Sequence, residues 1–545
     1  MRAAVIVVAL GLACSGPARQ SAGAASPPDK TVTSADVALL ELVDEVFERR
    51  VSRSPQLQTR LGRKTGYHRW DDISEAHRAE TNRLERQDLE ALRTRVDRNA
   101  LSASSRLTYD LFEYQLEERL AGHQWRHHSY PVNQMYGYHT AVPSFLINYH
   151  HIESEADARA YVARQRAVSG LFGQLTAQLQ IRESKGVLPP AFVFPRTIDS
   201  ARRVITGSPF DDSGKPSTLL RDFLDKLDDS ELAAETKKAL IAEAKAALRD
   251  STGPAYRKLI AFLGSQAKRA TRDDGAWKLP DGGTYYDYRL RTITTTDMTA
   301  EQIHELGQKE VARIHGEMRA IVNKVGFKGA LPAFFEHLRT AEQFYYPNTD
   351  AGRAAYLERA TKIIDVMRGR LDELFLTKPK AAIEVKRVES FRERSAGKAF
   401  YSRPTEDGKK PGTYYANLYD MRDMPRYQME ALAYHEGIPG HHMQLSIAQE
   451  LKKLPRFRRY SGFTAYSEGW ALYAERVAKE IGMYADPYSD FGRLAMELWR
   501  ACRLVVDTGI HVNKWTREQA IDYLMKNTPN PRGDAVKAIE RYIVI

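Results

Sequence analysis

From about Asp36 onward, hydrophobic residues recur three and four positions apart, with charged residues between them. Leu39, Val43, Val46 and Phe47 illustrate the spacing, which places one apolar face along a helix. The same pattern runs through residues 76–121, 153–182, 217–248, 253–269, 299–325, 351–376, 427–453, 464–481, 487–512 and 516–526. The pattern therefore predicts a mainly α fold.

Helix starts and short strands refine this prediction. Thr299 and Thr516 each stand three residues before a Gln, a spacing typical of a capped helix N-terminus. Alternation at 382–388, and Thr and Tyr residues at 412–419, predict two short strands. The sequence has no internal repeat and no Pro- or Ser-rich linker after residue 35. Residues 36–545 are therefore predicted to form a single, mainly helical domain.

Composition and charge narrow the class of protein. Hydrophobic residues make up 43% of the 545 residues and charged residues 28%, as in ordinary soluble globular proteins. The formal net charge is +11, yet Lys and Arg are spread along the chain among Asp and Glu. A nucleic-acid groove needs a compact basic run with interleaved aromatic residues, and the sequence has none. We expect a surface of mixed sign, with at most a mild preference for anionic partners and no nucleic-acid partner.

The first 14 residues have the form of a signal peptide. Arg2 is followed by the apolar run 3–13, which is too short to span a bilayer. The run ends at Cys14 in a segment that resembles a lipoprotein signal, although Gly11 stands where Leu is usual. Residues 15–35, rich in Ser, Ala, Gly and Pro, predict a flexible linker. A lipid on Cys14 is the only membrane contact that we expect.

Cleavage by an ordinary signal peptidase near residues 22–24 is the alternative. Either route places the body outside the cytoplasm. We therefore expect the cell envelope of a bacterium, as a periplasmic or outer-membrane-anchored lipoprotein, or else a secreted protein. The second cysteine, Cys502, lies in an apolar helical stretch and is expected to be a buried, unreactive thiol.

The segment with the clearest chemistry runs from Tyr434 through His-Glu-Gly-Ile-Pro-Gly-His to His442. Many zinc hydrolases present two ligands and a general base from one helix as a His-Glu pair followed by a His four positions from the first. Here the second His is six or seven positions on. On a regular helix His441 would lie about 240° around the axis from His435, and His442 about 10 Å along it, too far for one ion.

Residues 437–440, Gly-Ile-Pro-Gly, offer a way to bring the histidines together. Proline removes a backbone donor, and glycine accepts conformations that other residues avoid. We interpret the segment as an expanded turn, of the kind found at functional sites, that returns His441 to the side of His435. The sequence leaves open whether His441 or His442 is the ligand.

A zinc hydrolase needs a third protein ligand. Glu468 lies among aromatic and small residues on a following helix, where a metal would offset the cost of an unpaired carboxylate. Glu475, two turns on, is better placed to hydrogen-bond a ligand than to be one. Taken singly, a His-Glu pair, a His-His pair and a helical Glu are each more often surface or core residues. Their conjunction is what predicts the site.

Several blocks of the sequence together resemble the DUF885 family of bacterial proteins. The blocks are Pro411–Asn417, His435–Gln444, Glu468–Glu475, Asp507–His511 with Trp515–Thr516, and upstream Thr294–Asp297 and Ile303–Gly307. The resemblance covers most of the chain after residue 35 and implies a metallopeptidase, secreted or lipid-anchored. The family is similar in architecture to zinc peptidases of the oligopeptidase and angiotensin-converting-enzyme type. This similarity implies a two-lobed helical shell around a channel, with a small β-element lining the active site.

The resemblance also implies a metal site with one zinc ion per chain. His435, His441 and Glu468 correspond to the metal ligands. Glu436 corresponds to the general base, which takes a proton from water. The catalytic part would then lie within residues 380–545.

Further residues are expected to contact the substrate or the transition state. His442 would be an adjacent or substrate-side group, and Tyr415 and Asn417 would lie on a strand, 414–417, that pairs with an extended peptide. Charge on the tetrahedral intermediate needs a donor besides the metal. By analogy with similar enzymes, His511 and Tyr542 are the candidates.

Two features of the C-terminal region leave alternatives open. Arg503, Asp507 and His511 are four residues apart on one helix face, and a surface ion-pair ladder is as good an interpretation as a catalytic one. Family members commonly continue past a block like Arg541–Ile543 into a Pro-Gly-Gln segment and a further helix, whereas this sequence stops at Ile545.

The sequence therefore predicts zinc-dependent hydrolysis of peptide bonds, in short peptides, in the cell envelope. One alternative is a catalytically weak or inactive envelope protein that binds peptides. The other is a metal-dependent hydrolase that acts on non-peptide amides or esters.

Overall fold

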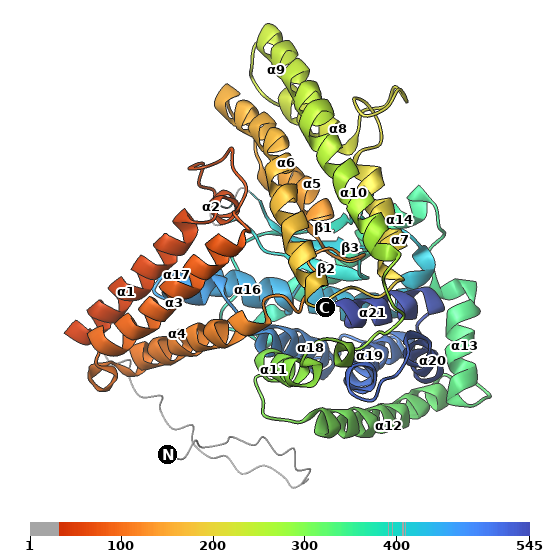
Figure 1. Ribbon diagram of the computed structural model, residues 1–545. Coiled ribbons are helices and arrows are strands. Elements are labelled where there is room, and N and C mark those ends of the chain that lie inside the picture. The colour runs from red at the N-terminus through yellow and green to blue at the C-terminus, as the bar shows by residue number, and fades with distance from the viewer. Residues whose placement is uncertain (1–31, 391, 395, 406–407, 409) are drawn as a thin grey trace.

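The computed structural model describes residues 32–390, 392–394, 396–405, 408 and 410–545. The predicted signal peptide, with Cys14, and most of the predicted linker lie outside the described residues. The described chain is mainly α with one small sheet, which confirms the predicted fold class (Figure 1). Among the described residues no helix is long and apolar enough to cross a membrane. The two-lobed shell around a channel stays a prediction.

The first helices form a group of their own, coloured red to orange in Figure 1. They are α1 (Ser34–Ser52), α2 (Pro55–Arg60), α3 (Glu75–Arg95) and α4 (Ala103–Gly122). Their apolar faces pack together and against Phe457 of α17 (Arg456–Tyr460), from the far end of the sequence. The periodic stretch 76–121 is two helices, because Ser102 accepts a hydrogen bond from the backbone of Ser105 and begins α4 anew.

The next helices build a second core in the upper part of Figure 1. They are α5 (Tyr138–Tyr149), α6 (Glu155–Ser184), α7 (Val193–Val204), α8 (Thr218–Asp228), α9 (Ala234–Ala247) and α10 (Gly253–Ala267). The predicted stretch 217–248 is again two helices, α8 and α9. Neither this group of helices nor the first contains a predicted metal residue, because these residues all lie in the C-terminal part of the chain.

The remaining helices form the C-terminal part of the chain, which carries the predicted metal residues. They are α11 (Gly282–Thr294), α12 (Ala300–Lys324), α13 (Leu331–Thr340), α14 (Asp350–Arg368), α15 (Met429–Glu436), α16 (His441–Glu450), α17, α18 (Thr464–Glu480), α19 (Pro487–His511), α20 (Arg517–Asn527) and α21 (Arg532–Val544). Both predicted caps are confirmed, since Thr299 and Thr516 each form a reciprocal capping box with the Gln three residues on.

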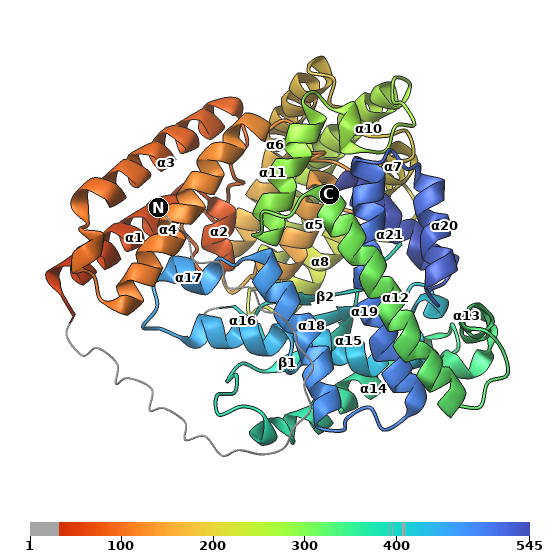
Figure 2. The same cartoon turned by 90° about the horizontal axis from the view of Figure 1, so that it is seen from below.

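The long helix α19 packs against many of the other helices of this part of the chain, and Figure 2 shows α12 lying along it. The two backbones come close at Gly307, where a Cβ would lie 2.7 Å from the Cβ of Leu504 and 2.8 Å from a methyl group of Val505. Only a residue without a side chain fits there. The helix that carries candidate residues 503, 507 and 511 is therefore packed closely against α12.

The sheet has three strands in the order β1-β3-β2. They are β1 (Ile383–Arg387), β2 (Ala399–Ser402) and β3 (Gly412–Ala416), with β1 parallel and β2 antiparallel to β3. The strands predicted at 382–388 and 412–419 are confirmed, and β2 was not predicted. Strand β3 is buried throughout and has a neighbour along each edge. The expectation that residues 414–417 pair with a peptide is therefore wrong, because no backbone edge of β3 is left to pair.

Candidate metal centre

The predicted turn between the two histidines is a full break in the helix. α15 ends at Glu436 and α16 begins at His441, with residues 437–440 between them. The chain folds back so tightly that a Cβ at Gly440 would lie 2.0 Å from the carbonyl oxygen of His435. Only glycine allows this approach. As a result the imidazole rings of His435 and His441 lie with their centroids 4.8 Å apart.

Three side chains from three helices converge at this break. The Nε2 atom of His435 is 3.6 Å from one carboxylate oxygen of Glu468, and Nε2 of His441 is 3.7 Å from the other. One ligand atom from each residue lies within 4.8 Å of the other two. Two ligands of a tetrahedral zinc ion, each about 2.1 Å from it, are about 3.4 Å apart. The spacing therefore fits a single ion of this kind.

Behind His435 stands the carboxylate of Glu475, which is 1% exposed. Its Oε1 lies 2.9 Å from Nδ1 of His435, so this bond turns Nε2 toward Glu468. Arg500 of α19 holds the carboxylate in turn, with its guanidinium 3.2 Å from Oε1. The same guanidinium approaches Nδ1 of His435 to 3.0 Å and Nε2 to 3.3 Å. Glu475 thus contacts a candidate ligand and not the cluster itself.

Glu436, the next residue after His435, is 6% exposed. Its Oε2 atom is buried and has no hydrogen-bond partner among the described residues. Burial raises the pKa of this carboxyl group to about 7, against the opposing effect of His435. A carboxylate with a pKa near neutrality suits proton transfer at neutral pH.

His441 and Glu468, the other two residues of the cluster besides His435, differ in exposure and charge. Burial lowers the pKa of His441 to about 4, with a contribution from neighbouring His435, so its imidazole is neutral and able to bind a metal. A hydrogen bond from His435 lowers the pKa of Glu468 to about 2, against the effect of burial. The side chain of Glu468 is 56% exposed. The cluster is therefore open to solvent on its Glu468 side.

His442 points away from the cluster. Its Nδ1 lies 2.9 Å from the hydroxyl of Tyr401 in β2, and its Nε2 lies 3.0 Å from the carbonyl oxygen of Ala381. Both ring nitrogens thus have protein partners, and the ring ties the start of α16 to the sheet. Of the two adjacent histidines, the structure brings His441 and not His442 to His435 and Glu468.

The other two residues predicted to bind substrate, besides His442, are also occupied by protein contacts. The ring of Tyr415 stacks on Phe400 with centroids 4.9 Å apart, and it is 6% exposed. The side-chain amide of Asn417 donates to the carbonyl oxygens of Glu393 and Ala396 at 2.8 and 2.9 Å. Their role in substrate binding stays a prediction, and the geometry favours support of the sheet and its loop.

The two predicted oxyanion donors contact each other and not the cluster. His511 accepts a hydrogen bond at Nδ1 from the backbone of Ala276 at 2.9 Å, and its Nε2 lies 3.0 Å from the carbonyl oxygen of Tyr542. The hydroxyl of Tyr542 accepts from Nε of Arg503 at 2.7 Å, so its own proton remains available to donate. Asp507 accepts a hydrogen bond from the hydroxyl of Tyr286 in α11. Residues 503, 507 and 511 thus contact other elements and do not form an ion-pair ladder on the surface.

Three side chains near the cluster were not predicted. Arg500 contacts His435 of the cluster, and Tyr401 contacts His442, the residue after His441. Arg403 directly follows the last residue of β2. The sequence could have indicated a role for Arg500, because it stands in the apolar run 498–502, where a charged side chain needs a buried partner. Tyr401 and Arg403 gave no signal, since their strand and its place beside α16 depend on the tertiary fold.

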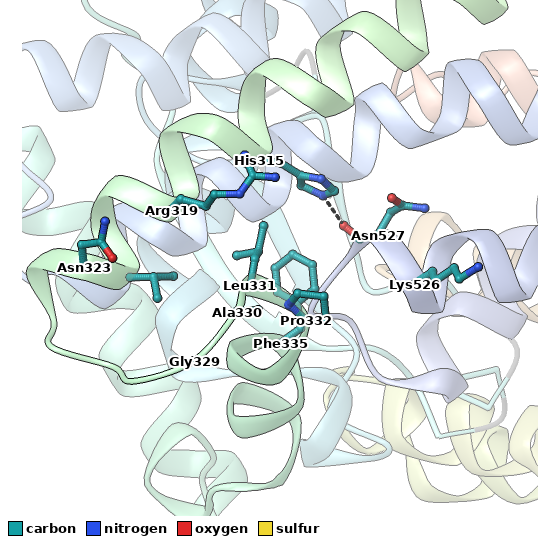
Figure 3. A pocket seen from close by; sticks show the side chains of 11 residues that line it. His315, Arg319, Asn323, Gly329, Ala330, Leu331, Pro332, Phe335, Lys526 and Asn527 are labelled. Carbon is teal, nitrogen blue, oxygen red and sulfur yellow. Dashed lines mark hydrogen bonds between the residues drawn. The ribbon is translucent and has the colours of Figure 1, made fainter.

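Two cavities share no lining residue with the metal cluster. The first, of about 510 Å³, lies where α12, α13 and α20 meet, and Arg319 and Lys526 reach into it beside the bonded pair His315 and Asn527 (Figure 3). The second, of about 570 Å³, is lined largely by basic residues: Arg196, Arg203, Arg394, Arg532 and Lys537. The metal cluster is thus a separate feature of the molecule.

Comparison with known proteins gives a family and two solved neighbours. A family model described as bacterial protein of unknown function (DUF885) matches residues 55–545. A candidate lipoprotein from Colwellia psychrerythraea superposes with a TM-score of 0.85 at 28% identity, covering 94% of this chain and 88% of that one. Another, of unknown function, from Shewanella oneidensis, gives 0.66 at 18% identity over 93% and 89%, which shows the fold alone. No curated protein matches.

Proposed function

This chain belongs to the DUF885 family, and we propose that it is a zinc-dependent hydrolase that cleaves peptide bonds in short peptides. One observation carries the proposal. His435, His441 and Glu468 bring three ligand atoms within 4.8 Å of one another, beside the buried and unpartnered carboxylate oxygen of Glu436.

The donor set fits zinc better than magnesium or calcium. Two imidazoles and one carboxylate are a known zinc set, whereas magnesium and calcium prefer oxygen ligands alone. His435, His441 and Glu468 would hold the ion, with Glu475 fixing the first of them. A zinc ion bound there would supply a Lewis acid that acidifies water and polarises a carbonyl group.

Glu436 would move the proton in this reaction. Its Oε2, which lacks a protein partner, is placed to accept a proton from an attacking water and to pass it to the leaving amine. Tyr542 is the better of the two predicted oxyanion donors, because its hydroxyl oxygen accepts from Arg503 and keeps its proton to donate. His511 has both ring nitrogens engaged by backbone groups.

An extended substrate would pair with β2 in place of β3. Among the described strands, β2 has a neighbour on one side only. Its Tyr401 contacts His442, the residue after ligand His441, so the strand lies beside the cluster. A peptide added to this edge gains main-chain hydrogen bonds without dependence on sequence.

We place the protein in the cell envelope. The predicted lipid attachment at Cys14 and the candidate lipoproteins among its structural neighbours support this location. Protein purified without chelator is expected to contain one zinc per chain by elemental analysis and to cleave members of a short-peptide library. Absence of any transition metal would contradict the proposal. Cleavage of small amides or esters but of no peptide would confine the site to non-peptide substrates.

A further inference from the structure

Within the described part of the chain, Arg403 carries a positive charge that no carboxylate pairs with, within electrostatic reach of His441. This arginine follows the last residue of β2 and precedes Pro404, and a following proline favours an extended backbone at the residue before it. Two positions earlier, Tyr401 contacts His442 at the start of α16. The strand therefore directs the chain at residue 403 along the N-terminal end of the helix that begins with His441.

Its guanidinium lies close to the segment between α17 and α18. Nη2 of Arg403 is 3.9 Å from the position that a Cβ would take at Gly462, two residues before the first residue of α18, which carries Glu468. α16 and α18 pack against each other (Figure 2). The positive charge of Arg403 also contributes to the lowered pKa of His441. Arg403 thus stands near the start of α18 and within electrostatic reach of His441.

Almost none of the hydrogen-bonding capacity of Arg403 is used. An arginine has five N–H donors, and the one hydrogen bond found for Arg403 in the described part of the chain is a long one, 3.5 Å, to the carbonyl oxygen of Tyr460. Within that part, no carboxylate lies within ion-pair distance of it. Burial lowers its pKa, so the cation has lost part of its hydration without gaining a counter-ion from the described residues.

The other two arginines near the cluster are engaged differently. Arg500 is paired with Glu475 at 3.2 Å, and Arg503 donates to Tyr542 at 2.7 Å. Among the residues that the structure describes, Arg403 is the one of the three whose charge has no anionic partner. A planar guanidinium matches a carboxylate through two parallel hydrogen bonds.

We propose that Arg403 binds a carboxylate of the peptide substrate, and that this carboxylate is the free C-terminus. The proposal rests on the function proposed above. Because Arg403 stands next to the cluster, a C-terminal carboxylate held there would place the scissile bond near the end of the peptide. The enzyme would then remove residues from the C-terminus of short peptides. An acidic side chain close to the scissile bond carries the same chemical group and is the other source to be distinguished.

The test compares matched peptides that differ only in this group. One short peptide is used as the free acid and as the C-terminal amide, and a second pair differs by Glu or Gln beside the scissile bond. The wild-type protein is expected to cleave the acid with a kcat/KM about 10- to 100-fold above that of the amide. Arg403→Gln should lower kcat/KM for the acid to about that for the amide, so that the preference is lost, and Arg403→Lys should restore part of it.

A matched control and a binding measurement keep the test independent of turnover. Arg319→Gln alters an exposed arginine in the cavity of Figure 3 and should keep the full preference. Calorimetry on Glu436→Gln protein measures binding of the uncleaved peptides, and the acid should bind more tightly than the amide only while Arg403 is present. Melting temperatures of the variants check that each is folded.

The outcomes separate this inference from the proposed function. Equal cleavage and equal binding of acid and amide, and of the Glu and Gln peptides, would overturn the role of Arg403. A preference that follows the Glu side chain, and vanishes in Arg403→Gln, would keep the carboxylate site and change its source. If no peptide is cleaved but Glu436→Gln protein still discriminates acid from amide through Arg403, the carboxylate site stands and the hydrolase fails.

Discussion

Two groups of polar residues contact α19, and the fold uses them in opposite ways. At one, His435 and His441 turn their Nε2 atoms toward the same carboxylate, and the nearby Glu436 keeps an oxygen without a partner. At the other, His511 has each ring nitrogen bonded to a backbone group, and it links α19 to Tyr542 of α21. Both groups were predicted as functional from the sequence.

The difference shows how a site is told from a structural network. Buried polar groups are almost always hydrogen-bonded within the protein, so convergent groups without partners indicate a missing ligand. A single unpartnered oxygen is not enough, because Glu430 of α15, a partly buried residue, has a buried Oε2 without a partner among the described residues too. What distinguishes the first group is that three ligand atoms and a carboxylate meet at one place, open to solvent beside Glu468.

The largest expected effect is at Glu436. Glu436→Gln removes the proton acceptor but keeps the size of the side chain, so peptide hydrolysis should fall by about 10³-fold or more. Zinc content by elemental analysis should stay at one per chain, because Glu436 is not among the ligands. Activity within a few fold of wild type would show that another group takes the proton.

His441 and His442 make a matched pair of neighbours. His441→Ala should lose most of the zinc, because a ligand is removed. His442→Ala should keep the zinc and instead lose about 1–3 kcal/mol of stability, since the partners Tyr401 and Ala381 are left unsatisfied. Elemental analysis and urea unfolding measure the two effects. Zinc loss from His442→Ala alone would reverse the ligand assignment.

Glu475 should act through His435. Glu475→Gln weakens the bond that orients the imidazole, so zinc affinity should fall about 10- to 100-fold, measured by competition with a chelator. Glu480→Gln, an exposed change on the same helix, is the control. If both variants bind zinc as tightly as wild type, the contact between Glu475 and His435 has no bearing on the metal.

The second group should respond in stability and not in catalysis. His511→Ala leaves two backbone groups without partners, so the free energy of unfolding should fall by about 1–3 kcal/mol. At a temperature where the variant is folded, its rate of peptide hydrolysis should stay near that of the wild type. Hydrolysis slowed roughly 100-fold, with stability unchanged, would instead return His511 to the catalytic group.

The smallest effect concerns the buried carboxyl group of Glu430. Burial raises its pKa from 4.5 to about 7. Between these values the folded protein keeps a proton that the unfolded chain has released, so stability falls as pH rises through this window. Glu430→Gln should therefore be more stable than wild type at pH 8, by on the order of 1 kcal/mol, and nearly equal at pH 4. An equal gain at both pH values would show that charge is not the cause.

The amino-acid sequence by itself predicted the helical class, two of the three strands and both capping boxes, and it named the three residues that the structure brings together as a candidate metal cluster. These features depend on local patterns: the spacing of apolar residues, the Thr and Gln of the caps, and the His-Glu and Glu motifs. Helix boundaries were less well predicted. The stretches 76–121, 217–248 and 427–453 each proved to be two helices, because a periodic pattern continues across a short break.

Tertiary structure decided what no local pattern contains. It set which of His441 and His442 faces His435, because the chain folds back at Gly440 and only one ring can then turn inward. It made β3 a central strand and left β2 at the edge. It also brought Arg403 and Arg500 to the cluster. These contacts join residues far apart in the sequence, so their meeting depends on the packing of whole elements and not on the spacing of residues along one of them.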